Sequence, residues 1–140
     1  MNFSNNLIFI YKTHMSLPVL IYISKDSCPA CKSFNQREWE NVKYRLNGKV
    51  RFVSFRMKDG QRVPPCIEKY ADWFPNIILT SARNYNEYFT SDNECHLTKP
   101  GSLSALQFNS VEEDGVRKPA GRPYTADAIE AWFLKAVKKV

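Results

Sequence analysis

The sequence predicts an α/β domain in which a sheet is covered by helices, and three segments carry this prediction. Residues 19–23 form a continuous apolar run, as expected of a strand buried on both faces of a mostly parallel sheet. Residues 29–46 change to a helical period, and residues 125–140 carry an apolar stripe at the spacing i, i+3, i+4, i+7. A chain of 140 residues, 44% of them hydrophobic, is long enough for one domain with its own core.

The first helix is expected to begin at Pro29, because proline suits the first helical position. It should end at Asn47-Gly48, where glycine can adopt a positive φ. Residues 50–55 are rich in β-branched and aromatic side chains and predict the second strand. The helical period over residues 29–46 places four apolar side chains near one side: Phe34, Trp39, Val42 and Leu46.

A short helix is expected from Pro64-Pro65 to about Tyr70 or Asp72. Pro75 then stands directly before the apolar residues 76–79. Because proline cannot donate to the ladder, it is confined to the start or edge of a strand. The third strand is therefore expected to begin just after Pro75.

Residues 81–103 are polar and predict a loop inserted outside the core sheet. We expect the fold not to need this loop. Its aromatic residues, Tyr85, Tyr88 and Phe89, are candidates for a partner contact, and a tolerated surface loop is an equal alternative. Residues 103–111 predict a returning strand, and residues 112–115 a turn.

The last helix is the clearest element of the pattern. Thr125 is its expected cap, Asp127 lies in its first turn and Lys138-Lys139 in its last, in agreement with the helix dipole. Its predicted apolar stripe consists of Ile129, Trp132, Phe133, Ala136, Val137 and Val140.

Residues 1–16 are expected to be an N-terminal extension of a single domain at residues 17–140. The apolar stretch at residues 7–11 follows no lysine or arginine, so we do not expect a signal peptide; an added edge strand is its simplest use. No apolar run approaches the length of a membrane span. A cytoplasmic location is therefore expected. Whether translation starts at Met1 or Met15 stays open.

The pair Cys28 and Cys31, separated by Pro29 and Ala30, is the arrangement that indicates a chemistry. It follows the first strand and opens the first helix, so Cys28 should lie at a helix N-terminus. The free backbone N–H groups and the positive dipole end there favour the thiolate, which is the reactive form of cysteine. Cys31, one turn later, can close a disulfide with Cys28. The sequence thus predicts a redox-active dithiol.

Two other interpretations of this pair were weighed, a zinc site and inert structural thiols. Zinc needs two more ligands, and the candidates (Cys66, Cys95, His14 and His96) form no second C-x-x-C and no H-x-x-x-H. Cys66 and Cys95 are expected to be free thiols, one packed and one exposed. The alternative is a regulatory or intermolecular disulfide through Cys95.

Net charge is +6, and much of it gathers between residues 43 and 62. Such a patch could attract acidic protein, glutathione or nucleic acid. A solvated face is the simpler interpretation, and without a nucleic-acid motif we expect no nucleic-acid partner. Against the single acid Asp59, the segment has seven basic residues: Lys43, Arg45, Lys49, Arg51, Arg56, Lys58 and Arg62.

The order strand, C-x-x-C, helix, strand, short helix, X-Pro-strand, strand and terminal helix resembles the thioredoxin fold. The resemblance covers most of residues 17–140, apart from about 81–103. It implies a thioredoxin-like α/β fold, with a central mixed sheet flanked by helices and an insertion after the cis-proline strand. It also implies a cis Pro75 that faces the C-x-x-C and helps to bind extended substrate, with Phe74 supplying backbone groups.

The chain departs from thioredoxins proper around the cysteines. Ser27 replaces the tryptophan before the first cysteine, and Tyr22 stands where that family has a buried aspartate. Residues 24–32 are closer to the glutaredoxin pattern S-K-x-x-C-P-x-C, in which the lysine, here Lys25, helps to bind the carboxylate of glutathione. The T-V-P triplet and the Gly-Gly-Asp element of glutaredoxins are missing, so a glutathione site is half supported.

We therefore expect a thiol–disulfide oxidoreductase in which Cys28 attacks and Cys31 resolves. Phe74, Pro75 and Lys25 are the expected substrate-binding residues. Lys25 and Lys32 would also stabilise charge near the sulfur. No metal or organic cofactor is expected; the expected partners are disulfide-containing proteins, with glutathione as a second candidate. The alternative is a thioredoxin-fold binding or structural protein with a basic surface and little or no redox activity.

Overall fold

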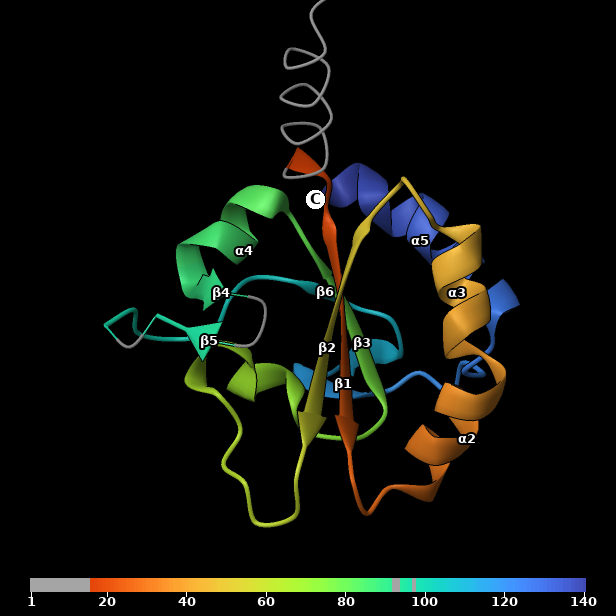
Figure 1. Cartoon of the computed structure of the whole chain (residues 1–140), viewed down its shortest axis with the longest axis horizontal. Helices are drawn as coiled ribbons and strands as arrows, with labels where there is room; N and C mark the ends of the chain where they lie inside the picture. Colours follow the sequence, from red (N-terminus) through yellow and green to blue (C-terminus); the bar gives the residue numbers. More distant parts are fainter. Residues whose placement is uncertain (1–15, 92–93, 97) are drawn as a thin grey trace, which may run out of the picture.

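The centre of the molecule is a four-stranded mixed sheet, seen in a computed structural model that describes residues 16–91, 94–96 and 98–140 (Figure 1). The strand order is β2-β1-β3-β6. β1 runs parallel to β2 and antiparallel to β3, and β3 is antiparallel to β6. The strands span Val19–Lys25 (β1), Arg51–Met57 (β2), Asn76–Thr80 (β3) and Leu106–Gln107 (β6).

Helices cover both faces of this sheet. One face carries α2 (Pro29–Arg37), α3 (Trp39–Arg45) and α5 (Ala126–Ala136), which continues into η2 (Val137–Lys139). The other face carries η1 (Pro65–Tyr70) and α4 (Ala82–Tyr88), so α4 and α5 lie on opposite sides of the strands in Figure 1.

β1 explains the continuous apolar run of the sequence. Leu20 and Tyr22 point into the core beneath α2, α3 and α5, whereas Val19, Ile21 and Ile23 point into the core beneath η1 and α4. Because successive side chains of a strand alternate between its faces, a strand covered on both sides needs apolar residues at every position. This prediction is confirmed.

The single helix predicted for residues 29–46 is two helices, α2 and α3, with a break at Glu38. Backbone angles at Glu38 are φ −120° and ψ −36°. Its carboxylate accepts a hydrogen bond from the N–H of Ala126 at 3.0 Å, which satisfies a free donor at the start of α5. The apolar face was predicted correctly, since Phe34, Trp39 and Val42 are all buried.

The segment 81–103 is not the polar loop that was predicted. It begins with α4, capped by Ser81, whose hydroxyl accepts from the N–H of Asn84 at 3.0 Å. A small hairpin of β4 (Phe89–Ser91) and β5 (Glu94–Cys95) follows, outside the four-stranded sheet. The rings of Tyr85 and Phe89 stack 4.6 Å apart in the core under α4. Tyr85 and Phe89 therefore belong to the core and not to a surface for a partner contact. The β4–β5 hairpin lies outside the four-stranded sheet, as expected of an insertion, and that the fold does not need the segment stays a prediction.

The strand predicted for residues 103–111 is also much shorter than expected. Of this segment, only the two residues of β6 pair with β3. Phe108 follows them and donates its N–H to the carbonyl of Ile77 at 2.9 Å. β7 (Ser110–Glu113) leaves the sheet and pairs with β8 (Val116–Pro119). The predicted turn lies between them, where Asp114 and Gly115 have φ of 52° and 78°.

The terminal helix begins as predicted. The hydroxyl of Thr125 accepts from the N–H of Ala128 at 3.2 Å, and Ile129 and Phe133 are buried. The predicted stripe is one residue too long, because Val140 is 42% exposed.

Three points of the sequence analysis lie outside the described residues. They are the edge strand expected at residues 7–11, the possible start at Met15, and His14. The domain boundary at residues 16 and 17 stays a prediction. Within the described part of the chain, no helix is long and apolar enough to cross a membrane.

Candidate active site

Cys28 occupies the N-cap of α2, directly after β1 and its turn. The turn is closed by a hydrogen bond from the N–H of Cys28 to the carbonyl of Lys25 at 3.1 Å. Backbone angles of φ −100° and ψ 105° make Cys28 extended, and Pro29 starts the helix. The Sγ of Cys28 accepts from the N–H of Cys31 at 3.0 Å, which is the contact that a thiolate needs at a helix start.

Cys28 and Cys31 form a disulfide, with their Cα atoms 5.2 Å apart. The two sulfurs differ in access, because Cys28 is half-buried and Cys31 is 1% exposed. An incoming group can therefore reach only Cys28. The geometry matches a dithiol in which the first cysteine exchanges with a partner and the second acts from inside.

The charged side chains close in sequence to Cys28 and Cys31 are two exposed lysines and one aspartate that is already paired. Asp26, two residues before Cys28, is bound by the guanidinium of Arg56, and the first turn of α2 holds no acidic residue. Lys25 and Lys32 flank the cysteines and are exposed. Positive charges near a cysteine, like a helix N-terminus, favour the thiolate form in the reduced protein.

The peptide bond between Phe74 and Pro75 is cis, as predicted. The antiparallel pairing of β1 with β3 ends at Ile23 and Asn76. Continuing that register by one residue brings Pro75, just before β3, beside Ser24. The Nζ of Lys25 lies 5.8 Å from the centre of the Phe74 ring. Lys25, Phe74 and Pro75 thus meet at the end of β1 from which Cys28 follows. Contact between Pro75 and the sulfur of Cys28 stays a prediction.

Comparison with solved structures decides the fold. The structure of the J-Trx1 fragment of ERdj5 matches with a TM-score of 0.51 and 11% identity, over 93% of this chain and 48% of the other. This chain has a thioredoxin fold. The Trx4 domain of ERdj5 matches with a TM-score of 0.47 and 13% identity, over 96% of this chain and 92% of the other. This chain thus spans about half the length of the J-Trx1 fragment. No protein-family model and no curated protein matches the sequence.

Tyr22 lies on the inner side of α2, on the β1 strand of the thioredoxin fold. Its hydroxyl donates to the carbonyl of Cys31 at 3.4 Å, and its ring packs against Phe34 and Trp39 with centroids 5.1 and 4.9 Å away. Burial raises the pKa of Tyr22 to about 12, although a hydrogen bond with Ser24 lowers it in part. Tyr22 is therefore neutral at physiological pH and cannot accept a proton as a carboxylate would.

Cys66 and Cys95 form a second disulfide, so the prediction of two free thiols is wrong. Their Cα atoms are 6.0 Å apart and the sequence separation is 29. The alternative of a disulfide through Cys95 was right about bonding, but the partner is within this chain. The pairing joins η1 to β5, two segments that only the tertiary fold brings together. The even number of cysteines was the one sequence signal for it.

The zinc interpretation has no support in the described residues, where no group of three or more histidine, cysteine or acidic side chains could hold a metal ion. His96 lies beside the second disulfide on β5 and binds through its backbone N–H to the carbonyl of Tyr88 at 2.8 Å.

The basic segment 43–62 does not form one free patch on the thioredoxin fold. Lys43 pairs with Glu40 at 2.8 Å, and Arg45 with Asp127. Arg56 holds Asp26. Several of the seven cations therefore serve local ion pairs on different elements.

Proposed function

We propose that this protein is a thiol–disulfide oxidoreductase that acts through Cys28 and Cys31. The observation that carries the proposal is the position of a half-exposed Cys28 at the N-cap of α2, with a buried Cys31 bonded behind it. A structural disulfide gains nothing from a helix N-terminus and an accessible sulfur, whereas a nucleophilic thiolate gains from both.

In the reduced protein, the thiolate of Cys28 attacks one sulfur of a substrate disulfide. The other substrate sulfur leaves as a thiolate and takes a proton from solvent, which gives a mixed disulfide. Cys31 then loses its proton to solvent and its thiolate attacks Sγ of Cys28. The Cys28–Cys31 bond forms, the second substrate thiolate leaves and is protonated, and two electrons have passed to the substrate.

Substrate would lie along the end of β3, where Phe74 offers its backbone groups and Pro75 limits the approach. An extended segment of a disulfide-containing protein fits this arrangement. Lys25 beside Phe74 supplies a cation that could hold the carboxylate of glutathione as a second substrate. No metal or organic cofactor takes part in the proposed exchange.

The cytoplasmic location expected from the sequence rested on finding neither a signal peptide nor a membrane span. A second disulfide, Cys66–Cys95, is more typical of proteins that fold in an oxidising compartment. We therefore propose that this protein works in an oxidising compartment, where the Cys66–Cys95 bond persists. Thiol counting on protein isolated under acid quench from its own cells tests this: two free thiols or none supports it, and four contradicts it.

Reduction of insulin by dithiothreitol, followed as turbidity, tests the proposed activity. The wild type should accelerate precipitation, and Cys28→Ser should bring the rate to the uncatalysed background. Cys95→Ser is the matched control, because it removes the other disulfide at its more exposed cysteine and should keep the activity. A wild type no faster than dithiothreitol alone would favour the alternative of a thioredoxin-fold binding protein.

A further inference from the structure

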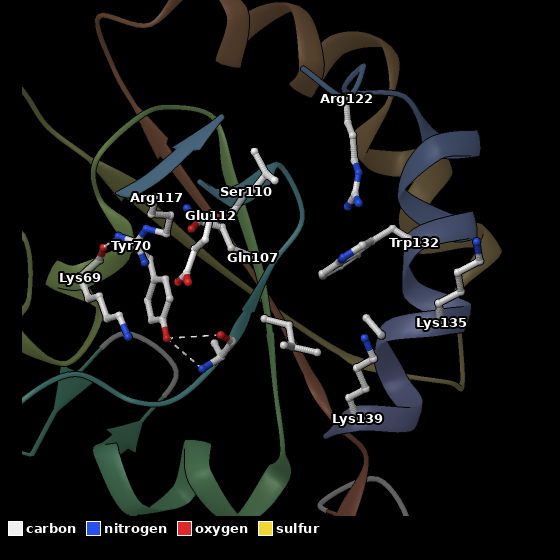
Figure 2. A pocket seen from close by; sticks show the side chains of 14 residues that line it. Lys69, Tyr70, Gln107, Ser110, Glu112, Arg117, Arg122, Trp132, Lys135 and Lys139 are labelled. Atoms are coloured by element: carbon white, nitrogen blue, oxygen red, sulfur yellow. Dashed lines mark hydrogen bonds between the residues drawn. The ribbon is translucent and has the colours of Figure 1, made fainter. Parts of the chain in front are cut away.

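An unassigned feature lies at the edge of the sheet, away from the reactive cysteines. It is a cleft of about 420 Å³ whose floor is β6. Figure 2 shows η1 and the β7–β8 hairpin on one side and α5 with η2 on the other. Among the strands of the described residues, β6 is the last of the sheet, so within that part of the chain the cleft opens onto an unpaired strand edge between the two helical layers.

Positive charge dominates the lining of this cleft. A single acid, Glu112, faces five basic residues that come from three separate parts of the chain: Lys69, Arg117, Arg122, Lys135 and Lys139. Figure 2 shows them on both sides of the cleft, with Glu112 between them. A concave surface lined by one sign of charge attracts a partner of the opposite sign.

The five cations differ in their contacts. The Nζ of Lys69 lies 5.7 Å from the centre of the Tyr70 ring. Arg117 is held by Asp72 at 2.8 Å, and Arg122 by the carbonyl of Phe108 at 2.6 Å. Lys135 and Lys139 take part in no ion pair among the residues that the structure describes. The guanidiniums therefore complete the walls of the cleft, and the two lysines of α5 and η2 are available to a ligand.

The floor offers backbone groups as well. Phe108 directs its N–H at β3, and the alternation of an antiparallel ladder then turns the N–H and C=O of Gln107 outward. The hydroxyl of Tyr70 accepts from the N–H of Ala105 at 2.9 Å, and its single proton is shared between the carbonyls of Leu103 at 3.0 Å and Ala105 at 3.3 Å. The open backbone groups of the floor are thus those of Gln107.

We propose that this cleft binds an acidic, extended segment of a partner protein, which adds a strand to β6. Lys135 on α5 and Lys139 on η2 are four residues apart and both line the cleft, so their side chains start roughly one helical turn, about 5–6 Å, from each other. Alternate side chains of an extended chain are spaced by about 6.6–6.8 Å. Two carboxylates at i and i+2 of the segment therefore match the two lysines while its backbone meets Gln107.

A compact phosphate ligand fits this site less well. The five cations of the lining come from three separate parts of the chain. The cations also stand on opposite walls, which suits a chain that runs between them. Trp132 is engaged edge-to-face with Phe108, with centroids 5.5 Å apart, so its ring is a wall of the cleft and offers no free pair of faces for stacked bases.

Fluorescence anisotropy with a labelled peptide of about eight residues, alternating glutamate and threonine, tests the proposal. Lys135→Glu/Lys139→Glu should weaken binding by at least about tenfold, since two attractions become repulsions. Glu112→Gln should tighten it by about two- to fivefold, because the one opposing carboxylate is removed. The matched control Lys49→Glu/Lys58→Glu, with the same charge change on exposed residues outside the cleft, should stay closer to wild type than the cleft variant.

The strand addition has its own pair of variants. Gln107→Pro removes the outward N–H without touching the ladder to β3, and Gln107→Ala removes only the side chain that bonds Asp72. Binding should fall in the proline variant and persist in the alanine variant. In ¹⁵N spectra of the wild type, the Gln107 amide should gain protection from exchange when the peptide is added.

Three outcomes would overturn the proposal. The first is equal loss in the cleft and control charge variants, which would mean attraction by net charge alone. The second is equal binding of the proline and alanine variants at position 107, which would exclude strand addition. The third is displacement of the peptide by an equal concentration of thymidine oligonucleotide or of pyrophosphate, which would assign the cleft to a nucleic acid or a small anion.

Discussion

The two disulfides of this chain occupy opposite helical layers and differ in nearly every property that governs reactivity. Cys28–Cys31 closes a separation of 3 residues at the start of a helix, with one sulfur half-exposed. Cys66–Cys95 closes a separation of 29 and ties η1 to the β4–β5 hairpin, with Cys66 at 2% exposure. The first bond constrains almost nothing that the backbone does not already fix, whereas the second holds two distant segments together.

This difference suggests a division of labour between chemistry and stability. Cross-linking stabilises a fold mainly by restricting the unfolded chain, and the effect grows with the length of the closed loop. Reactivity instead follows thiolate stabilisation and access. Thiolate stabilisation and access favour Cys28–Cys31 as the reactive bond, and loop length favours Cys66–Cys95 as the stabilising one. Measurements of reactivity and of stability should therefore separate the two bonds.

The largest expected contrast is between the two cysteines of the reactive pair. In the reduced protein, iodoacetamide should modify Cys28 while Cys31, which is 1% exposed, stays unmodified. The rate should level off below the free-cysteine pKa of about 8.5, because the N–H of Cys31 and the start of α2 stabilise the thiolate. Peptide mass spectrometry after short labelling measures both. Labelling of Cys31 first would contradict the proposed mechanism.

The next contrast concerns stability. Cys95→Ser should lower the free energy of unfolding by about 3–4 kcal/mol, whereas Cys28→Ser should lower it by about 2 kcal/mol or less, as expected from loops of these two lengths. Urea unfolding of the two oxidised variants measures the difference. Both substitutions replace the more exposed cysteine of a pair, so each leaves its buried partner in place. A Cys28→Ser variant less stable than Cys95→Ser would reverse the assignment.

Features of the fold and of the site that depend on residues close together in the sequence could be predicted from it, whereas features that depend on distant residues could not. Residues 19–23, the C-x-x-C at the start of α2 and the cap at Thr125 are local patterns, and the structure confirms each of them. The mixed character of the central sheet and the cis bond at Pro75 came from the resemblance to thioredoxins. They could not be worked out from spacing alone, since cis is the minority state of an X-Pro bond.

The missed features depend on contacts between distant segments. Glu38 breaks the predicted helix while binding Ala126, and Cys66 finds Cys95 only because α4 and the β4–β5 hairpin fold back over η1. Tyr85 and Phe89 were judged by their polar neighbours, although the ring of Phe89, just after α4, stacks on that of Tyr85 in the core. The cleft above β6 escaped for the same reason, because its cations come from η1, the β8 region and the terminal helix.

A smaller effect is expected from pH on the side of the molecule that carries the reactive pair. Because burial raises the pKa of Tyr22 to about 12 from its ordinary value of 10.0, the folded state holds the neutral phenol more strongly than the unfolded chain does. This contribution is fully present below about pH 10 and is lost as the pH rises from about 10 toward 12. Urea unfolding of the oxidised protein across this range should show the loss.

Tyr22→Phe is the test of that assignment. The variant should lose a hydrogen bond to the carbonyl of Cys31, at a cost of about 1 kcal/mol at neutral pH, and its stability should fall less steeply above pH 10. Tyr70 and Tyr124, whose pKa values are also raised by burial, keep their share of the alkaline loss. An unchanged slope in Tyr22→Phe would show that the hydroxyl is not the group that titrates.

The smallest expected effect is a change in KM when one lysine is removed near either disulfide. Lys25 lies over the ring of Phe74 beside the reactive pair, and Lys99 lies over the ring of Tyr88, 5.1 Å from its centre, near β5. Lys25→Ala should raise KM for a disulfide substrate by about two- to fivefold, because an exposed cation contributes less than about 1 kcal/mol. The same rise should shrink in about 0.5 M salt, where such an attraction is screened. Lys99→Ala removes an equivalent lysine–aromatic pair and should leave KM unchanged; equal effects of the two variants would mean that Lys25 has no special place in substrate binding.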